Sequence, residues 1–237
     1  MEYFDFILAK DFHKRPKNND DYNPPIGWDM SEKLDGYRAR YIPDKKQFIS
    51  RQNKYFNSPK WFTEWFPDIH LDGELYAAKK NFEYMGIVRK KEPVDEEWIN
   101  IKYYIYDLPE MNDIFMNRYK EMKNLINEIE KTWDKYKLSL DEKYHDLDCP
   151  IVLVDQIKIK TIKQMETFYN KIIKNGGEGI MIRDPNSKYE NKRSNHLLKY
   201  KPLDEDEAQI IGYNPGSGKY KNKLGSFIVK PLINKTL

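Results

Sequence analysis

The sequence has 237 residues, of which 39% are hydrophobic and 33% are charged, with 41 basic side chains against 38 acidic ones. This length suits one large domain, or one domain with a small appendage. We find no signal peptide and no apolar run of membrane-spanning length, and the single cysteine, Cys149, excludes a disulfide framework and a cysteine-based zinc cluster. We therefore expect a soluble intracellular protein that does not bind a membrane.

The first part of the chain predicts a lead-in followed by short strands. Residues 1–27 are polar and rich in turns after a short apolar start, and we expect them to drape over the core. Strands are predicted on either side of the Asp35-Gly36 turn, and such a hairpin would place Lys33 and Arg38 on adjacent antiparallel strands. Together with those that follow, the predicted strands cover residues 28–32, 37–41, 47–51, 70–76, 102–108, 151–159, 178–183 and 196–201.

Two segments carry apolar residues at alternating three- and four-residue steps, which predicts amphipathic helices. The clearer helix covers residues 114–136, and the second covers residues 161–174. A short helix is predicted after Pro59, and short helical pieces are predicted within residues 81–100. Because strands dominate and the helices are few, we expect an α+β fold with two largely antiparallel β-sheets flanked by helices.

After Pro202 the composition changes. An acidic run at residues 204–207 precedes two predicted strands, residues 208–213 and 224–230, and five lysines but no acidic residue follow from Tyr213 onward. We expect a first domain of residues 1–202 and a separate module of residues 203–237 that meets a polyanionic partner. A solvated lysine-rich surface is the alternative.

Lys33 begins the stretch Lys-Leu-Asp-Gly-Tyr-Arg, residues 33–38. A lysine attacks phosphorus only as a neutral amine, and an unperturbed lysine, with a pKa of about 10.4, is charged at neutral pH. Cationic neighbours and partial burial lower the pKa of a lysine, and Arg38, Lys199 and Lys201 could supply such charge. We interpret Lys33 as a nucleophile that carries a nucleotide covalently. The alternative is an exposed hairpin turn, because Asp-Gly is common in turns.

Several short stretches follow one another in the order and at the spacing of known motifs. They resemble the nucleotidyltransferase motifs of the ATP-dependent DNA ligase family, shared in part with RNA ligases and mRNA capping enzymes. Within that family the chain looks most like the minimal ligases that lack an N-terminal DNA-binding domain, and the tail from Ala208 resembles the start of the family's OB-fold β-barrel. The motif-like stretches are residues 33–38, 50–51, 72–75, 104–108, 178–183 and 198–202.

The resemblance implies a role for each of these stretches. Lys33 would attack the α-phosphate of ATP, while Lys199 and Lys201, on one face of a strand, would neutralise charge in the transition state; an exposed basic strand is their alternative. Glu74 and Glu178 suit Mg²⁺ or Mn²⁺, unless they are surface acids. The implied nucleotide-binding set is Glu32, Lys33, Arg38, Arg51, Glu74, Tyr106, Met181, Lys199 and Lys201, with Tyr106 stacking on adenine unless it is a core tyrosine. The implied DNA-contacting set is Arg51, Arg183, Arg193, Lys219 and Lys221. The three arginines would bind the 5′-phosphate of a nick, and a surface ion pair is the alternative for each.

The implied activity is the sealing of nicks in double-stranded DNA by a monomer that uses ATP. An RNA ligase or a GTP-using capping enzyme shares the Lys-x-Asp-Gly core, and a catalytically inactive nucleic-acid-binding module could keep the fold. The OB domain of the family usually ends in a basic motif that orients the pyrophosphate of ATP. The sequence ends at Leu237, soon after two OB-like strands, so we expect an incomplete barrel and weakened self-adenylation or DNA binding.

Overall fold

A computed structural model describes residues 5–14, 25–77, 84–202, 208–218 and 221–231. The chain divides into two compact units, residues 1–201 and residues 202–237, and each is described by itself. The assignment of these units as an adenylation domain and a partial OB-fold domain stays a prediction.

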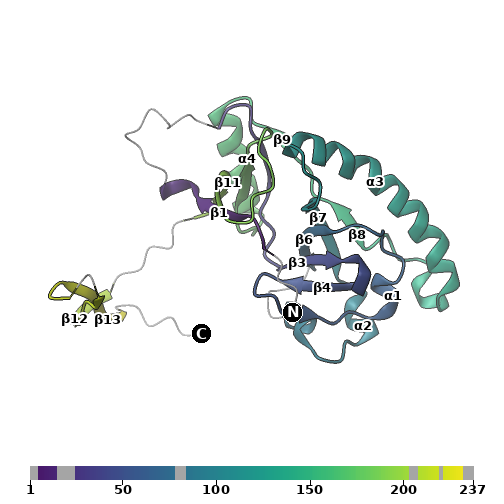
Figure 1. Cartoon of the computed structure of the whole chain (residues 1–237), viewed down its shortest axis with the longest axis horizontal. Coiled ribbons are helices and arrows are strands. Elements are labelled where there is room, and N and C mark those ends of the chain that lie inside the picture. The colour runs from purple at the N-terminus through teal and green to yellow at the C-terminus, as the bar shows by residue number, and fades with distance from the viewer. Residues whose placement is uncertain (1–4, 15–24, 78–83, 203–207, 219–220, 232–237) are drawn as a thin grey trace. The chain divides into compact units, whose positions relative to one another are not determined.

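Two β-sheets build the larger unit (Figure 1). The five-stranded sheet contains β1 (Leu8–Asp11), β2 (Asp29–Glu32), β9 (Ile157–Lys158), β10 (Ile180–Arg183) and β11 (Arg193–Tyr200), in the order β1-β11-β10-β2-β9. The six-stranded sheet contains β3 (Tyr37–Ile42), β4 (Gln47–Ser50), β5 (Tyr55–Phe56), β6 (Leu71–Tyr76), β7 (Lys102–Asp107) and β8 (Ile151–Leu153), in the order β5-β4-β3-β6-β7-β8. Only the β1–β11 and β7–β8 pairs among these described strands are parallel, so the expected α+β fold with largely antiparallel sheets is confirmed.

The segment around Lys33 is not the predicted hairpin. Strand β2 pairs with β10 and β9, whereas β3 pairs with β4 and β6, so residues 33–36 cross from one sheet to the other. Gly36 is required there because a Cβ atom would collide with the carbonyl oxygen of Leu75 in β6. The Asp-Gly pair predicted a turn from local preference, but tertiary packing decides which strands pair.

Two further expectations need correction. The single strand predicted over residues 151–159 is two short strands in different sheets, since β8 pairs with β7 and β9 pairs with β2. The lead-in does more than cover the core, because residues 8–11 form β1 beside β11 and the preceding Phe6 and Ile7 are buried. Residues 1–4 and 15–24 of the predicted lead-in lie outside the described residues.

Each sheet is covered by a long helix, and both predicted helices are confirmed. Helix α3 (Phe115–Tyr136) runs along the six-stranded sheet and packs on β7 and β8 (Figure 1), burying Met122, Ile129 and Trp133. Helix α4 (Ile162–Lys174) packs Met165 and Ile172 into the core of the five-stranded sheet. The described short helices are α1 (Lys60–Thr63), α2 (Asp95–Trp98), and the 3₁₀ turns η1 (Phe12–Lys14), η2 (Pro43–Lys45), η3 (Tyr84–Arg89), η4 (Lys137–Ser139) and η5 (Glu142–Tyr144).

Among the described residues, none of the helices combines the length and apolar character that crossing a membrane requires. The described part of the smaller unit is a β-hairpin of β12 (Ala208–Pro215) and β13 (Leu224–Pro231), which cover both strands predicted there. Several of its apolar side chains are exposed, among them Ile210, Tyr213, Phe227 and Val229.

Candidate active site

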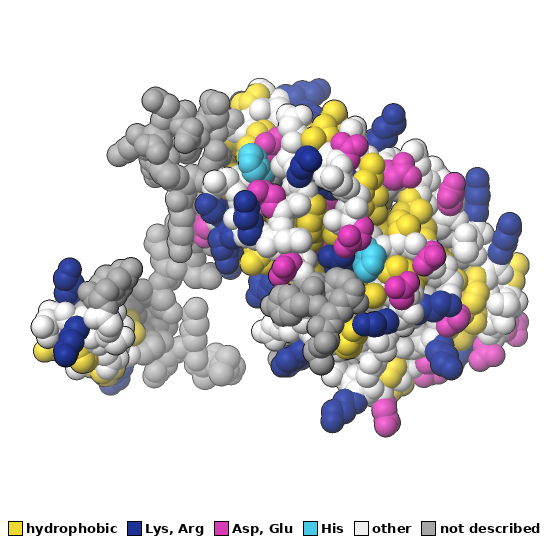
Figure 2. Space-filling model, in the orientation of Figure 1, with side chains coloured by type: hydrophobic (Ala, Val, Ile, Leu, Met, Phe, Trp, Pro, Cys, Tyr) yellow, Lys and Arg dark blue, Asp and Glu magenta, His cyan; other side chains and the backbone are white. Residues whose placement is uncertain are grey.

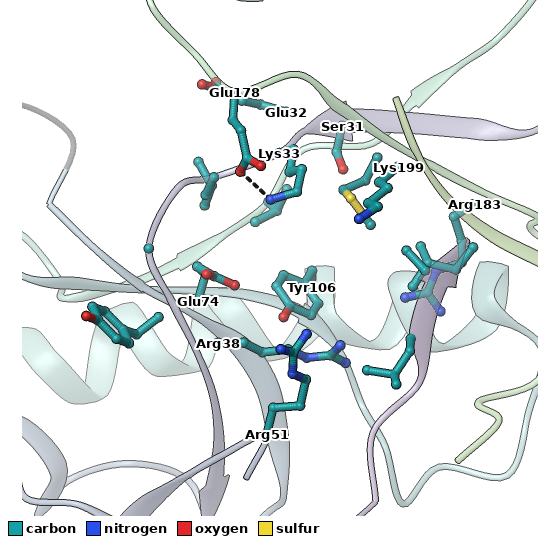
Figure 3. Close-up of a pocket in the computed structure, with 18 of the residues that line it drawn as sticks. Ser31, Glu32, Lys33, Arg38, Arg51, Glu74, Tyr106, Glu178, Arg183 and Lys199 are labelled. Atoms are coloured by element: carbon teal, nitrogen blue, oxygen red, sulfur yellow. Dashed lines mark hydrogen bonds and ion pairs between the residues drawn. The ribbon is translucent and has the colours of Figure 1, made fainter. Parts of the chain in front are cut away.

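A cavity of about 670 Å³ in the larger unit is lined from both sheets. Lys33 follows β2, and Lys199 lies in β11, so both belong to the five-stranded side. Arg38 in β3 and Tyr106 in β7 belong to the six-stranded side. Figure 3 shows the two groups of side chains facing one another across the pocket. The site is therefore assembled where the two sheets meet, and the crossing of residues 33–36 joins its two halves.

All the predicted site residues of the larger unit line this cavity. In the smaller unit, Lys221 is exposed, and Lys219 lies outside the described residues. The roles implied for these residues stay predictions. The residues brought together are Glu32, Lys33, Arg38, Arg51, Glu74, Tyr106, Glu178, Met181, Arg183, Arg193, Lys199 and Lys201.

Lys33 forms an ion pair with Glu178 inside the cavity. Its Nζ atom donates to Glu178 Oε2, and about a quarter of each side chain is exposed. Lys201 Nζ lies 4.0 Å from the other carboxylate oxygen of Glu178. The backbone N–H of Lys33 also donates to the carbonyl oxygen of Gly179 at 2.9 Å. The sequence predicted cationic neighbours for this amine, and the structure adds an anionic one in direct contact.

The floor of the five-stranded side is a row of three residues on adjacent strands. Met181 in β10 lies opposite Lys199 in β11 and opposite Ser31 in β2, and all three line the cavity. Lys201 follows Lys199 by two residues, and it lines the same cavity because side chains of an extended segment alternate between faces. Lys199 and Lys201 thus lie on the same face, as predicted from the sequence.

Arg38 is held in place by the buried carboxylate of Asp72, for which the sequence predicted no role. Its Nε and Nη2 atoms donate to Asp72 at 3.1 and 2.6 Å, and its Nη1 atom donates to the carbonyl oxygen of Ile7 at 2.6 Å. Asp72 is fully buried. The guanidinium carbon of Arg38 also lies 5.7 Å from the centre of the Tyr106 ring. A signal for Asp72 was available, since alternation along a strand places it on the same face as Glu74.

Glu74 and Glu178 form the carboxylate pair of the cavity. Burial raises the pKa of Glu74 to about 8, although Arg38 and Lys33 lower it, and the negative charge of Glu178 contributes to the rise. Two carboxylates facing one cavity suit Mg²⁺, which retains waters and takes one or two carboxylates beside substrate phosphates. No group of three or more His, Cys, Asp or Glu within the described ranges could form an all-protein metal cage. The donor set therefore fits a metal that arrives with a nucleotide.

Residues 8–201 match the family model of the ATP dependent DNA ligase domain. The chain belongs to the ATP-dependent DNA ligase family. The DNA ligase of Haemophilus influenzae is 31% identical over 209 residues, which are 88% of this chain and 70% of that protein. Two solved structures share the fold. A Lig E DNA ligase has a TM-score of 0.71 at 24% identity, covering 98% of this chain and 81% of that one. The Chlorella virus DNA ligase-adenylate has a TM-score of 0.64 at 20% identity, covering 98% and 82%.

Arg183 of this ligase has an internal partner. Its Nη1 atom donates to Asp107 Oδ2 at 2.8 Å, and its side chain is only 6% exposed. Asp107 also accepts two hydrogen bonds from Arg118 in α3, at 2.6 and 3.1 Å. Burial by itself would raise the pKa of Asp107, but the two arginines outweigh it and hold the pKa below its ordinary value. These contacts suit a structural role for Arg183, in which it links the two sheets. The DNA contact predicted for Arg183 stays a prediction.

Arg51 and Arg193 are exposed at the cavity. Sequence reasoning did not assign two further cationic side chains of the lining, Lys54 and Arg89. On the face of the ligase that Figure 2 shows, basic and acidic side chains are interspersed, in keeping with a net charge of +3. Candidates for phosphate contacts are therefore the cationic residues at the cavity rather than an overall positive surface.

Proposed function

We propose that this protein seals nicks in double-stranded DNA, with ATP as the donor of an AMP group carried on Lys33. The support for this function is a single cavity in which residues from distant segments meet: Lys33 and Glu178 in contact, Lys199 and Lys201 beside them, and Glu74 and Tyr106 across the pocket. Family membership supports the same function. All these residues belong to one chain, which favours action as a monomer.

The first step forms the covalent intermediate. Lys33 Nζ loses a proton, for which Glu178 Oε2 is the base in contact, and attacks the α-phosphorus of ATP. An N–P bond forms, the nitrogen loses its second proton to solvent, the bond between the α-phosphorus and the bridging oxygen to the β-phosphate breaks, and pyrophosphate leaves. Lys199 and Lys201 stabilise the negative charge that builds on the phosphate oxygens, since phosphoryl transfer depends mainly on positioning and charge.

The two later steps use the same groups. The 5′-phosphate of the nick attacks the AMP phosphorus, the N–P bond breaks, and Lys33 recovers its amine. The 3′-hydroxyl then loses its proton and attacks the activated 5′-phosphate, a phosphodiester forms, the anhydride bond between that phosphate and AMP breaks, and AMP leaves. Glu74 and Glu178 would hold Mg²⁺ or Mn²⁺, which neutralises phosphate charge when bound.

Substrate contacts divide between the two sides of the cavity. On the six-stranded side, the Tyr106 ring offers a face for adenine, and Arg38, already oriented by Asp72, reaches the ribose. Glu32 and Met181 complete the nucleotide site. Arg51 and Arg193 bind the 5′-phosphate of the nick by paired hydrogen bonds, and Lys219 and Lys221 of the smaller unit bind the DNA backbone.

Mass spectrometry after incubation with ATP and Mg²⁺ tests the proposal. We expect one AMP adduct on the wild-type protein, loss of the adduct in Lys33→Ala, and conversion of nicked duplex to sealed duplex by the wild type. Parallel incubation with GTP separates the alternatives, because an adduct from GTP alone would identify a capping-type enzyme. Binding of nicked duplex without any adduct would instead identify a catalytically inactive binding module.

A further inference from the structure

Tyr189 connects the five-stranded side of the cavity to the carboxylate that holds Arg38. It lies in the segment between β10 and β11, and its hydroxyl donates to Asp72 Oδ2 at 2.7 Å. Asp72 lies in β6 of the other sheet, and the same Oδ2 atom accepts the 2.6 Å hydrogen bond from Arg38 Nη2. A single buried oxygen atom thus accepts from Arg38 in the six-stranded sheet and from Tyr189 in the segment that joins two strands of the five-stranded sheet.

We propose that Tyr189 is a positioning residue for ATP, which fixes Asp72 and through it the orientation of Arg38 in the cavity. This inference rests on the proposed function, because Arg38 matters here as a contact to the nucleotide. Tyr189 does not itself line the cavity, and its hydroxyl is linked to the lining through the Asp72–Arg38 pair.

The hydroxyl of Tyr189 matters because Asp72 is fully buried. The side-chain hydrogen bonds described for the Asp72 carboxylate come from Arg38 and Tyr189. Without the hydroxyl, a buried carboxylate oxygen loses a donor, and such a group rotates or recruits water to recover the bond. Arg38 follows this carboxylate because two of its nitrogens are bonded to it. A small displacement of a group that orients a substrate is costly to binding and rate.

Tyr189 is a hydrogen-bond donor because its hydroxyl keeps its proton. Burial, together with the negative charge of Asp72, raises the pKa of Tyr189 far above its ordinary value. The phenol therefore stays protonated and donates, while Asp72 accepts. Tyr189 therefore acts as a constant hydrogen-bond donor to Asp72 rather than as a pH-sensitive switch.

Separate contacts hold the ring of Tyr189 and the segment before it. The guanidinium of Arg118 lies 5.9 Å from the centre of the ring. The carbonyl oxygen of Ser187 accepts hydrogen bonds from the backbone of Phe115 at 2.8 Å and from Arg118 Nη1 at 3.2 Å. A phenylalanine at position 189 keeps the ring and these contacts, so Tyr189→Phe removes the hydroxyl while leaving the segment anchored.

Tyr144→Phe is the matched control. The hydroxyl of Tyr144 donates to Asp95 Oδ2 at 3.1 Å, in a part of the fold that does not line the cavity. Both variants lose one hydroxyl-to-carboxylate hydrogen bond. Formation of the lysyl–AMP adduct is measured at a series of ATP concentrations in single turnovers. We expect Tyr189→Phe to raise the half-saturating ATP concentration about three- to thirtyfold, with the maximal rate within about twofold of wild type. Tyr144→Phe should stay within about twofold on both measures.

A double-mutant cycle separates action through Arg38 from a general loss of packing. Tyr189→Phe is measured again in an Arg38→Lys background, where we expect its effect on half-saturating ATP to fall below about twofold, because the side chain that it orients is gone. If the two substitutions instead raised the half-saturating ATP concentration by independent factors that multiply in the double variant, the inference would be overturned. An equal half-saturating concentration in Tyr189→Phe and wild type would overturn it as well.

ATP binding in the absence of adduct formation gives a second comparison of Tyr189 with Tyr189→Phe. It is measured calorimetrically in a Lys33→Ala background. If the wild-type chain forms no adduct at all, the proposed function fails, while the ATP affinities with Tyr189 and with Tyr189→Phe still decide whether this residue positions Arg38. Equal affinities there would count against the inference alone.

Discussion

Asp107 in β7 accepts a 2.8 Å hydrogen bond from Arg183 in β10, although the two strands belong to different sheets. Asp107 is fully buried and also accepts two bonds from Arg118 in α3. Together with the Tyr189–Asp72 bond, this ion pair joins the two walls of the cavity. The relative position of the proposed nucleophile and the proposed nucleotide-binding groups therefore depends on buried charge as well as on apolar packing.

Asp107→Asn should lower the free energy of unfolding at pH 7 by about 3–5 kcal/mol, because it leaves two buried guanidinium groups without their anionic partner. Urea unfolding followed by circular dichroism measures the change. The control is Glu97→Gln, which removes the surface ion pair with Lys90 and should change the free energy by less than about 1 kcal/mol. Equal stabilities of Asp107→Asn and the control would show that the link is not a structural one.

The stabilisation from Asp107 should depend on pH in one direction. Its folded-state pKa is lowered, whereas the unfolded chain has a pKa of about 3.9. A lowered pKa means that the contribution is complete above the unfolded value and is lost as the pH falls through the folded value. The gap in unfolding free energy between wild type and Asp107→Asn should therefore be flat from about pH 8 to pH 5 and narrow below about pH 4. A gap that changes between pH 5 and pH 8 would contradict the assignment.

The sequence predicted most of the residues that line the cavity, but it did not predict the strand pairing or the buried charged partners that hold them in place. Alternation along a strand placed Lys199 and Lys201 on one face, and the motif-like stretches collected the residues of one cavity. The hairpin around Asp35-Gly36 was wrong because strand pairing is decided between residues far apart in the chain. The buried partners Asp72 and Asp107 were missed for a related reason, since the partner of a charge is fixed by tertiary contact.

Glu178→Ala should abolish metal-dependent formation of the lysyl–AMP adduct, with a loss of at least about a hundredfold. Glu178 contacts Lys33 directly and contributes one carboxylate of the predicted metal pair. The measurement is the adduct yield across a Mg²⁺ titration, with the thermal midpoint recorded for each variant. A fully active Glu178→Ala protein would show that both the contact and the metal assignment are irrelevant to the chemistry.

Tyr106→Ala should mainly weaken ATP binding. Stacking of a base on an aromatic ring contributes about 1–3 kcal/mol, so we expect the half-saturating ATP concentration to rise between about fivefold and about 150-fold. Tyr106→Phe keeps the ring and should stay close to wild type. Tyr106 also lies against Arg38, so a similar loss in both variants would point to the hydroxyl, and not to stacking, as the important group.

Two arginines of the cavity should respond to substitution in opposite ways. Arg193 is exposed, and its Nη1 atom donates to the carbonyl oxygen of Ala9 at 2.8 Å, so Arg193→Ala should leave the unfolding free energy close to wild type. It should weaken binding of nicked duplex and lower the slope of log affinity against log salt by about one. Arg183→Ala should instead lower stability by about 3–5 kcal/mol, since it strips a buried carboxylate of a cationic partner. Weakened DNA binding by Arg183→Ala at unchanged stability would restore its predicted phosphate contact and reject the link between the sheets.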